Sequence, residues 1–158
     1  MDFEKFISMY GNDLKNGIMS ESCVNDFFDL VLEMGVSEKR SLTSQLKRLY
    51  THMLKYLYQP EKQTRSWINT IRNSHYELQE YYFESKNIWK SVTEDDIMRC
   101  YINAVSSAGN ETGIDKRKFS KELSEDFYLE NIVNTDYIEN FLKNNAYSYE
   151  AKKVLYLI

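Results

Sequence analysis

The chain is poor in the residues that interrupt helices. It contains one proline and five glycines, none adjacent to another, among 158 residues. Proline removes a backbone hydrogen bond and glycine adds conformational freedom, so their scarcity favours long helices. No segment combines two-residue alternation of apolar and polar side chains with an Asn-Gly or Asp-Gly turn, so no strand is predicted. Because the glycines are scattered singly, a glycine-rich phosphate loop is also excluded.

Cysteine and long apolar runs are scarce as well. Cys23 and Cys100 are the two cysteines, and neither has a CxxC-type neighbour. Free thiols are typical of the cytoplasm, which is the location that we expect. The N-terminal segment lacks the basic and apolar regions of a signal peptide. No run approaches the roughly 18 apolar residues of a membrane helix, so no membrane partner is expected.

Charge, in contrast, is abundant and unevenly distributed. Residues 1–36 have a formal net charge of −5, residues 37–90 of +5 and residues 91–158 of −4. A basic middle between acidic flanks either pairs within the fold or presents a basic face to an anionic partner. We favour internal pairing.

The basic segment predicts a helical hairpin. Its first helix, about residues 38–58, places apolar side chains at spacings of three and four residues. Pro60 stops that helix, and Thr64 or Ser66 begins the return helix, about residues 65–84. Such a short connection makes the two helices antiparallel. The residues predicted to pack between them are Leu46, Leu49, Met53, Trp67, Ile71 and Leu78.

Further helices are predicted on both sides of the hairpin. In the N-terminal part, Gly17 ends a first helix, and a second helix begins at Ser20 or Ser22 and ends at Gly35. Ser37 then caps the first helix of the hairpin. After a break at residues 87–91, Thr93 caps a helix that ends near Gly109. Short helical pieces are expected around residues 127–133, 137–143 and 149–157.

These patterns predict an all-α, single-domain helical bundle built on the long antiparallel hairpin. We assign residues 1–143 to the helical domain. We assign residues 144–158 to a C-terminal extension that forms a short helix.

Several segments carry a resemblance to a known family. They are LEMGVSEKRSL from residue 32, HMLKYLYQPEKQTRSW from residue 52 and INTIRNS from residue 68. They resemble the bacterial domain-of-unknown-function family 29, and ETGI at 111–114 and FYLENIVNTDYI at 127–138 resemble its C-terminal signature. The resemblance covers about residues 3–142 and implies an all-helical fold without an assigned activity. The chain departs from the family pattern at residues 115–126 and extends beyond it after Lys143.

One group of polar residues could form a site at the closed end of the hairpin. Cationic donors around a neutral imidazole can bind phosphate or carboxylate. The alternative, which we favour, is a structural turn in which Trp67 covers the core and Arg65 pairs with Glu61. The candidate residues are Arg48, His52, Lys55, Tyr56, Gln59, Arg65, Ser66 and Trp67.

No metal or cofactor is predicted. His75 lies on the apolar stripe of its helix, where a lone histidine is typically a hydrogen-bonded core residue. The spacings HExxH, ExxH and CxxC are absent, and a metal site needs several ligands at matched spacing. We therefore expect neither metal-binding nor cofactor-binding residues.

Three functions remain open from the sequence. We favour a non-enzymatic cytoplasmic protein that binds a protein partner or itself through a helical face, because no catalytic constellation accompanies the 13 tyrosines. A nucleic-acid-binding module would use the basic hairpin face of residues 39–72. An enzyme or anion-binding protein would use the polar group around His52, Lys55 and Arg65.

Overall fold

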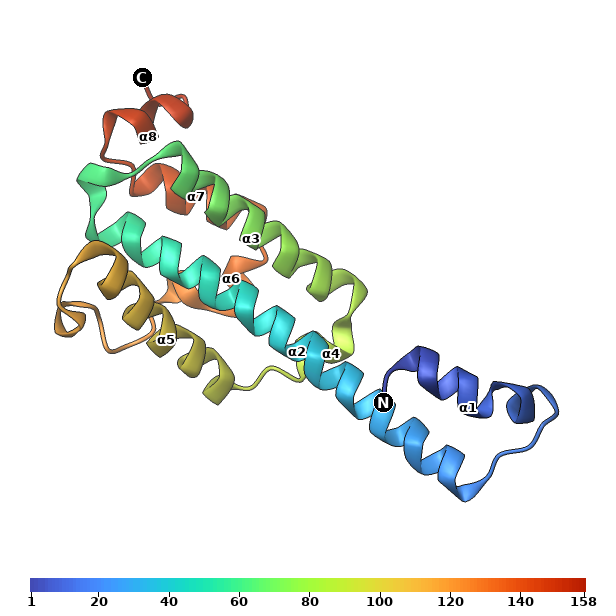
Figure 1. Ribbon diagram of the computed structural model, residues 1–158. Coiled ribbons are helices and arrows are strands. Elements are labelled where there is room, and N and C mark those ends of the chain that lie inside the picture. Colours follow the sequence, from blue (N-terminus) through green and yellow to red (C-terminus); the bar gives the residue numbers. More distant parts are fainter. The chain divides into compact units, whose positions relative to one another are not determined.

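The computed structural model describes residues 1–158 and contains helices but no strand, which confirms the predicted all-α fold (Figure 1). The chain divides into two compact units, residues 1–40 and residues 41–158. None of the helices is long and apolar enough to cross a membrane. The helices are α1 (Phe3–Lys15), α2 (Glu21–Tyr58), α3 (Arg65–Glu84), α4 (Lys86–Lys90), α5 (Glu94–Thr112), α6 (Leu129–Ile132), α7 (Thr135–Asn144) and α8 (Tyr149–Val154).

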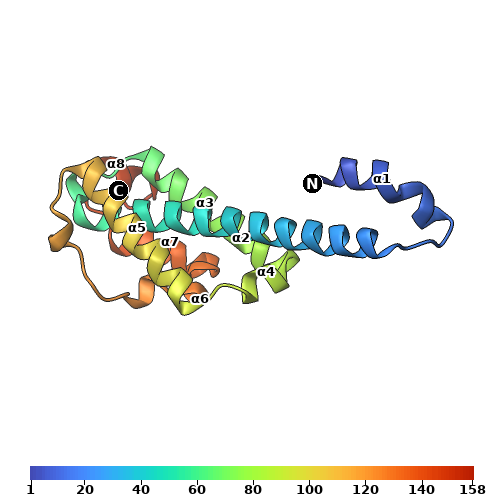
Figure 2. The same cartoon turned by 60° about the horizontal axis from the view of Figure 1, so that its bottom comes forward.

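The larger unit is a bundle built around the C-terminal part of α2. Figures 1 and 2 show this part of α2 between α3 on one side and α5 on the other. The predicted hairpin is confirmed, because α2 ends at Tyr58 and α3 begins at Arg65 with Thr64 as its cap. A 3₁₀ turn at Pro60–Lys62 joins the two helices. Helices α7 and α8 both pack against α3.

The core of the larger unit follows the predicted helical stripe. Five of the six residues that we expected between the hairpin helices are fully buried: Leu46, Leu49, Met53, Ile71 and Leu78. The sixth, Trp67, was placed wrongly, because it is only half-buried and lies outside the core cluster. Its ring instead lies beneath the ammonium group of Lys55. The small residues Ala104 and Ala108 of α5 are fully buried in the core, which allows close packing.

Buried tyrosines fix the bundle through their hydroxyl groups. Tyr50 is fully buried, packs edge-on against Tyr101 and Phe127, and donates a hydrogen bond to the backbone carbonyl of Phe127. Tyr56 is fully buried and donates to the carbonyl of Leu142 at 2.7 Å. A buried hydroxyl without a partner would be costly, so these bonds hold distant parts of the chain against α2.

The smaller unit is a short helical hairpin. Helix α1 lies alongside the N-terminal part of α2 (Figure 1), and Gly17 turns the chain between them with a positive φ of 73°. The Ser20 hydroxyl accepts from the backbone N–H of Cys23, so Ser20 rather than Ser22 caps α2. The core of the smaller unit consists of three buried residues, Phe6, Cys23 and Leu30, with Tyr10 and Leu14 packed against them.

The predicted end of a helix at Gly35 is wrong. Helix α2 runs without interruption from Glu21 to Tyr58, and Ser37 lies inside it instead of capping a new helix. A glycine ends a helix when it adopts a left-handed conformation, and Gly35 does not do so. A helical glycine costs only about 1 kcal/mol relative to alanine, which the continuous backbone hydrogen bonds of α2 offset.

Two other predicted boundaries also move. Helix α5 continues past Gly109 and ends at Thr112, followed by Gly113 as its C-terminal cap with a φ of 76°. Gly109 instead permits close approach, because a Cβ atom there would lie 3.1 Å from the carbonyl oxygen of Ile114. The predicted break at residues 87–91 is largely occupied by α4, and the chain leaves helical geometry at Ser85. No proline or glycine follows Ser85, so the helix resumes directly.

The C-terminal residues belong to the core of the larger unit. Ala151 and Leu155 are buried in its apolar cluster. Ser148 caps α8 by accepting from the backbone N–H of Ala151 and donates to the backbone carbonyl of Gln63 at 2.8 Å. The segment after residue 143 is therefore attached to the turn of the hairpin.

Candidate functional site

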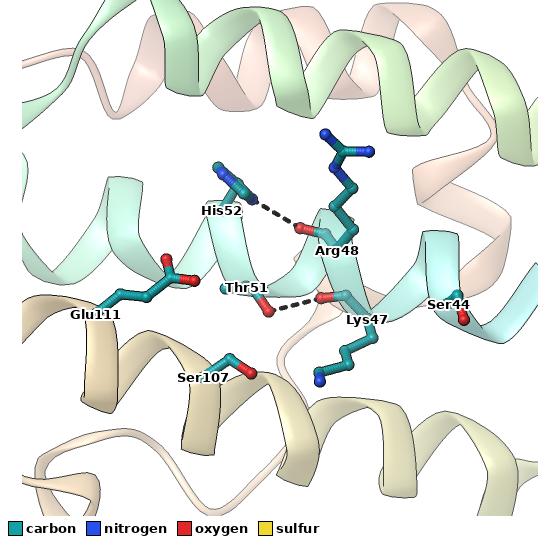
Figure 3. A pocket seen from close by; sticks show the side chains of 7 residues that line it. All are labelled: Ser44, Lys47, Arg48, Thr51, His52, Ser107 and Glu111. Atoms are coloured by element: carbon teal, nitrogen blue, oxygen red, sulfur yellow. Dashed lines mark hydrogen bonds between the residues drawn. The ribbon is translucent and has the colours of Figure 1, made fainter.

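A polar pocket lies on the surface between α2 and α5. Its volume is about 400 Å³. Figure 3 shows that Arg48 and His52 extend from one side of α2, while Lys47 extends from the other side, where α5 brings Ser107 and Glu111. Both helices therefore build the pocket. The residues that line it are Ser44, Lys47, Arg48, Thr51, His52, Ser107 and Glu111.

The charges of this pocket are not balanced within it. Lys47 and Arg48 are exposed and have no carboxylate partner, whereas Glu111 is paired with Lys55. The Nζ of Lys55 donates to Oε2 of Glu111 at 2.7 Å. With that pair neutralised, Lys47 and Arg48 leave the pocket with a net positive charge.

His52 is poised in its neutral form. Its Nδ1 lies 3.0 Å from the carbonyl oxygen of Arg48, so Nδ1 carries the proton and Nε2 keeps a lone pair. Burial lowers the pKa of His52, and the nearby charges of Lys55 and Arg48 lower it further, against the opposing effects of the Arg48 carbonyl and Glu111. An anion beside the ring would reverse that balance and favour protonation.

The structure brings only part of the predicted polar group together. Arg48 and His52 line the pocket, and Lys55 contacts it through Glu111. Lys55 is buried instead of lying on a solvated basic face, and its ammonium group lies 4.7 Å from the centre of the Trp67 ring. Tyr56 is a core residue.

The remaining predicted residues lie at the turn, away from the pocket lining. Arg65 and Ser66 are exposed, and Gln59 is half-buried. Arg65 contacts Glu150 through its backbone, whose N–H donates to Oε1 of Glu150 at 3.1 Å. The expected pairing of Arg65 with Glu61 is not found. A residue other than Arg65 therefore holds the turn in place.

That residue is Gln63, which is 1% exposed. Its amide nitrogen donates to the carbonyl groups of Tyr56 and Asn145 at 2.9 and 2.7 Å. Its amide oxygen accepts from the backbone N–H groups of Tyr147 and Ser148 at 2.8 and 3.2 Å. Three of these hydrogen bonds join the turn to the C-terminal segment, and the fourth joins it to the end of α2. The sequence placed Gln63 three residues after Pro60 but held no signal for partners more than 80 residues away.

Five residues line the pocket without having been among the predicted site residues: Ser44, Lys47 and Thr51 of α2, and Ser107 and Glu111 of α5. The sequence held a signal for the two residues of α5. They are four residues apart on α5, beside the buried Ala104 and Ala108. Side chains four residues apart share a helix face, and small buried neighbours indicate close contact with another helix. That pattern, together with the place of Glu111 in the ETGI motif, was a signal that could have identified both residues.

His75 is a hydrogen-bonded core residue, as predicted. It is buried, and its Nδ1 faces the carbonyl oxygen of Ile132 while its Nε2 lies 3.2 Å from the hydroxyl of Thr135. Burial lowers the pKa of His75 and outweighs the hydrogen bond to Ile132. No three His, Cys, Asp or Glu side chains converge in a way that could hold a metal ion.

The second candidate surface lies on the smaller unit. Large apolar side chains remain exposed on both helices of its hairpin although they recur at helical spacing. The rings of Tyr10, Phe6, Phe27 and Phe28 form a series of contacts that runs from the interior to this exposed surface. We name this surface the hairpin face; it comprises Phe3, Ile7, Phe27, Phe28, Val31, Leu32 and Met34.

The sequence matches one protein family over most of its length. The family is described as "Domain of unknown function DUF29", and the match covers residues 1–138. The chain belongs to the DUF29 family. No curated protein and no solved structure matches the chain. Membership of DUF29 includes both units, so the hairpin face and the pocket between α2 and α5 both lie within the family domain.

Proposed function

We propose that this DUF29 protein is a non-enzymatic interaction protein that binds a partner protein through the hairpin face. The observation that carries the proposal is the exposure of large apolar residues on a unit with only three buried ones. Contiguous exposed apolar surface on a folded protein marks interaction sites far more often than isolated exposed residues do.

The energetics of the smaller unit favour a bound partner. Full burial of a large apolar side chain contributes about 1.5–3 kcal/mol, and the hairpin leaves seven such side chains exposed on this face. Units of roughly 40 residues usually need disulfides, metals or association to become stable. A partner helix laid against the hairpin face would complete a packed helical layer.

The charges of the unit indicate the chemistry of that partner. Residues 1–40 contain eight acidic and four basic side chains, a formal net charge of −4. Asp29 and Glu33 are exposed, lie four residues apart on α2 and directly follow Phe28 and Leu32 of the hairpin face in the sequence. A second copy would bring like charges together, whereas a helix with lysine or arginine margins would be attracted. We therefore assign the face to an amphipathic partner helix with basic margins.

A peptide titration tests this assignment. The intact protein would be titrated with a synthetic amphipathic helix of leucine and lysine and with its leucine and glutamate analogue, by isothermal titration calorimetry. The proposal expects binding of the lysine peptide that weakens with salt, and much weaker binding of the glutamate peptide. In the Phe28→Gln/Leu32→Gln variant, affinity for the lysine peptide should fall at least about tenfold.

The matched control is Ile102→Gln. Ile102 on α5 is 59% exposed, close to the 61% exposure of Phe28, but it belongs to the larger unit. Its replacement should leave peptide affinity unchanged. Equal binding of both peptides, or equal losses in the two variants, would contradict the proposal. So would sedimentation equilibrium showing a dimer that requires Phe28 and Leu32, because the hairpin face would then be a self-association surface.

We also propose that the protein acts in the cytoplasm. Cys23 and Cys100 are both free and buried. Free thiols persist in reducing compartments, which supports this location. Labelling of fractionated cells with an antibody to the protein tests it.

A further inference from the structure

A second binding function, independent of the hairpin face, follows from the pocket between α2 and α5. We propose that this pocket binds a phosphate group, held by Lys47, Arg48 and the protonated imidazole of His52. The pocket lies wholly within the larger unit.

The positive charge of the pocket, which no carboxylate in the pocket neutralises, is the first observation that supports phosphate binding. Lys47 and Arg48 are consecutive on α2, are exposed, and have no carboxylate partner. Glu111, the only carboxylate in the lining, accepts from Lys55 at 2.7 Å and is neutralised by it. Two cations with free donors attract an anion, and the guanidinium group of Arg48 suits two phosphate oxygens at once.

Hydroxyl groups supply further donors on the α5 side. Ser44 and Ser107 both line the pocket and can turn their hydroxyl protons toward a ligand. Thr51 differs, because its hydroxyl already donates to the carbonyl of Lys47 at 2.8 Å. Lys47 and Arg48 extend to different sides of α2 in Figure 3, so joint contact with one phosphate requires both side chains to rotate toward it. Exposed side chains make such rotations on the nanosecond timescale.

The protonation of His52 distinguishes a phosphate bound in the pocket from general electrostatic attraction of anions to the protein surface. In the free protein its Nδ1 proton is directed at the carbonyl of Arg48, so Nε2 is a lone-pair acceptor. The charged groups that face it are Arg48 and Lys55 from α2 and Glu111 from α5. A phosphate dianion in the pocket favours the imidazolium form, in which Nε2 becomes a donor. Binding should therefore raise the pKa of His52.

The volume of the pocket also restricts the ligand class. About 400 Å³ lies within the range of small-molecule sites, roughly 300–1,000 Å³. It accommodates inorganic phosphate or the phosphate of a small phosphomonoester. In both ligands the pocket would recognise the same group, a phosphate with negatively charged oxygen atoms.

Titration of the intact protein with inorganic phosphate and with ribose 5-phosphate tests the proposal. Saturable binding is expected for at least one of them, and tighter binding of ribose 5-phosphate would identify a phosphomonoester as the natural source. Nuclear magnetic resonance of the His52 ring should show its pKa rising when the ligand is present. The Lys47→Gln/Arg48→Gln variant should bind at least about tenfold more weakly.

The control removes the same charges elsewhere in the larger unit. Lys62 and Arg65 are exposed at the turn, and the Lys62→Gln/Arg65→Gln variant should retain full affinity. Equal losses in both variants would overturn the proposal, because binding would then be general electrostatic attraction, as for a nucleic acid backbone. Absence of saturable binding of either probe, or a His52 pKa that does not rise with ligand, would also overturn it.

Discussion

The ammonium group of Lys55 lies 2.7 Å from Oε2 of Glu111, although the two residues are 56 positions apart. The pair is asymmetric, because the side chain of Lys55 is 11% exposed and that of Glu111 is 50% exposed. Trp67 lies beneath the same ammonium group. The buried partner therefore depends on the exposed one for its hydrogen bond.

This asymmetry predicts unequal effects of the two single substitutions. Glu111→Ala leaves a buried ammonium group without its acceptor and should lower the free energy of unfolding by about 1–3 kcal/mol. Lys55→Met leaves a carboxylate that water can solvate, and it should cost less than about 1 kcal/mol. Urea unfolding of both variants measures the difference. As a control, Arg117→Ala removes an exposed pair with Asp115 and should leave the unfolding midpoint unchanged. A larger loss for Lys55→Met than for Glu111→Ala would contradict this account.

The second prediction concerns the turn of the hairpin. Gln63→Ala removes four hydrogen bonds, one to the buried carbonyl of Tyr56 in α2 and three to part-buried backbone groups of the C-terminal segment. Its cost should be roughly 2 kcal/mol or more. Arg65→Ala, at an exposed neighbouring position, should stay within about 0.5 kcal/mol. Thermal unfolding of both variants decides which residue holds the turn. A destabilised Arg65→Ala beside an unaffected Gln63→Ala would reverse the assignment.

The third prediction concerns the core stripe of α2. Leu49 is fully buried, so Leu49→Ala should lower the free energy of unfolding by about 2–5 kcal/mol. Ile102→Ala removes an exposed apolar side chain from α5 and should change stability by less than about 0.5 kcal/mol. Guanidinium unfolding monitored by circular dichroism compares them. A loss for Leu49→Ala as small as that of the control would mean that the helix faces are assigned wrongly.

The fourth prediction concerns pH. Burial lowers the pKa of His75 and of His52 below the ordinary value near 6.5, so the unfolded chain binds more protons than the folded chain just below that pH. The contribution of the two histidines to the free energy of unfolding should be fully present above about pH 6.5. It should decrease as the pH falls from 6.5 toward the lowered pKa values. Hydrogen bonding to Arg72 lowers the pKa of Glu139, so the stabilisation that this pair contributes is lost only at more acidic pH.

Two substitutions separate the histidines. His75→Asn should reduce the dependence of the unfolding free energy on pH just below about pH 6.5, and adding His52→Asn should reduce it further. Both should be measured by urea unfolding at several pH values. An unchanged slope in the double variant would show that other groups cause the pH dependence.

Part of the candidate site was visible in the sequence. His52 and Arg48 are one helical turn apart, and helical periodicity alone places them on the same side of α2. That Ser107 and Glu111 lie beside them was not visible, because these two residues come from a helix that begins more than 40 residues later. Spacing along one helix says nothing about which distant helix lies beside it.

Helical periodicity in the sequence determined the all-α fold, the hairpin from α2 to α3 and its core from Leu46 to Leu78. These features follow from local propensity and from the scarcity of proline and glycine, so they need no knowledge of distant contacts. Only the tertiary structure decided that α2 continues through Gly35, that Lys55 is buried and that Gln63 holds the C-terminal segment. The physical reason is that a glycine, a lysine and a glutamine are each compatible with several environments. Packing and hydrogen bonding with residues far along the chain select one of them.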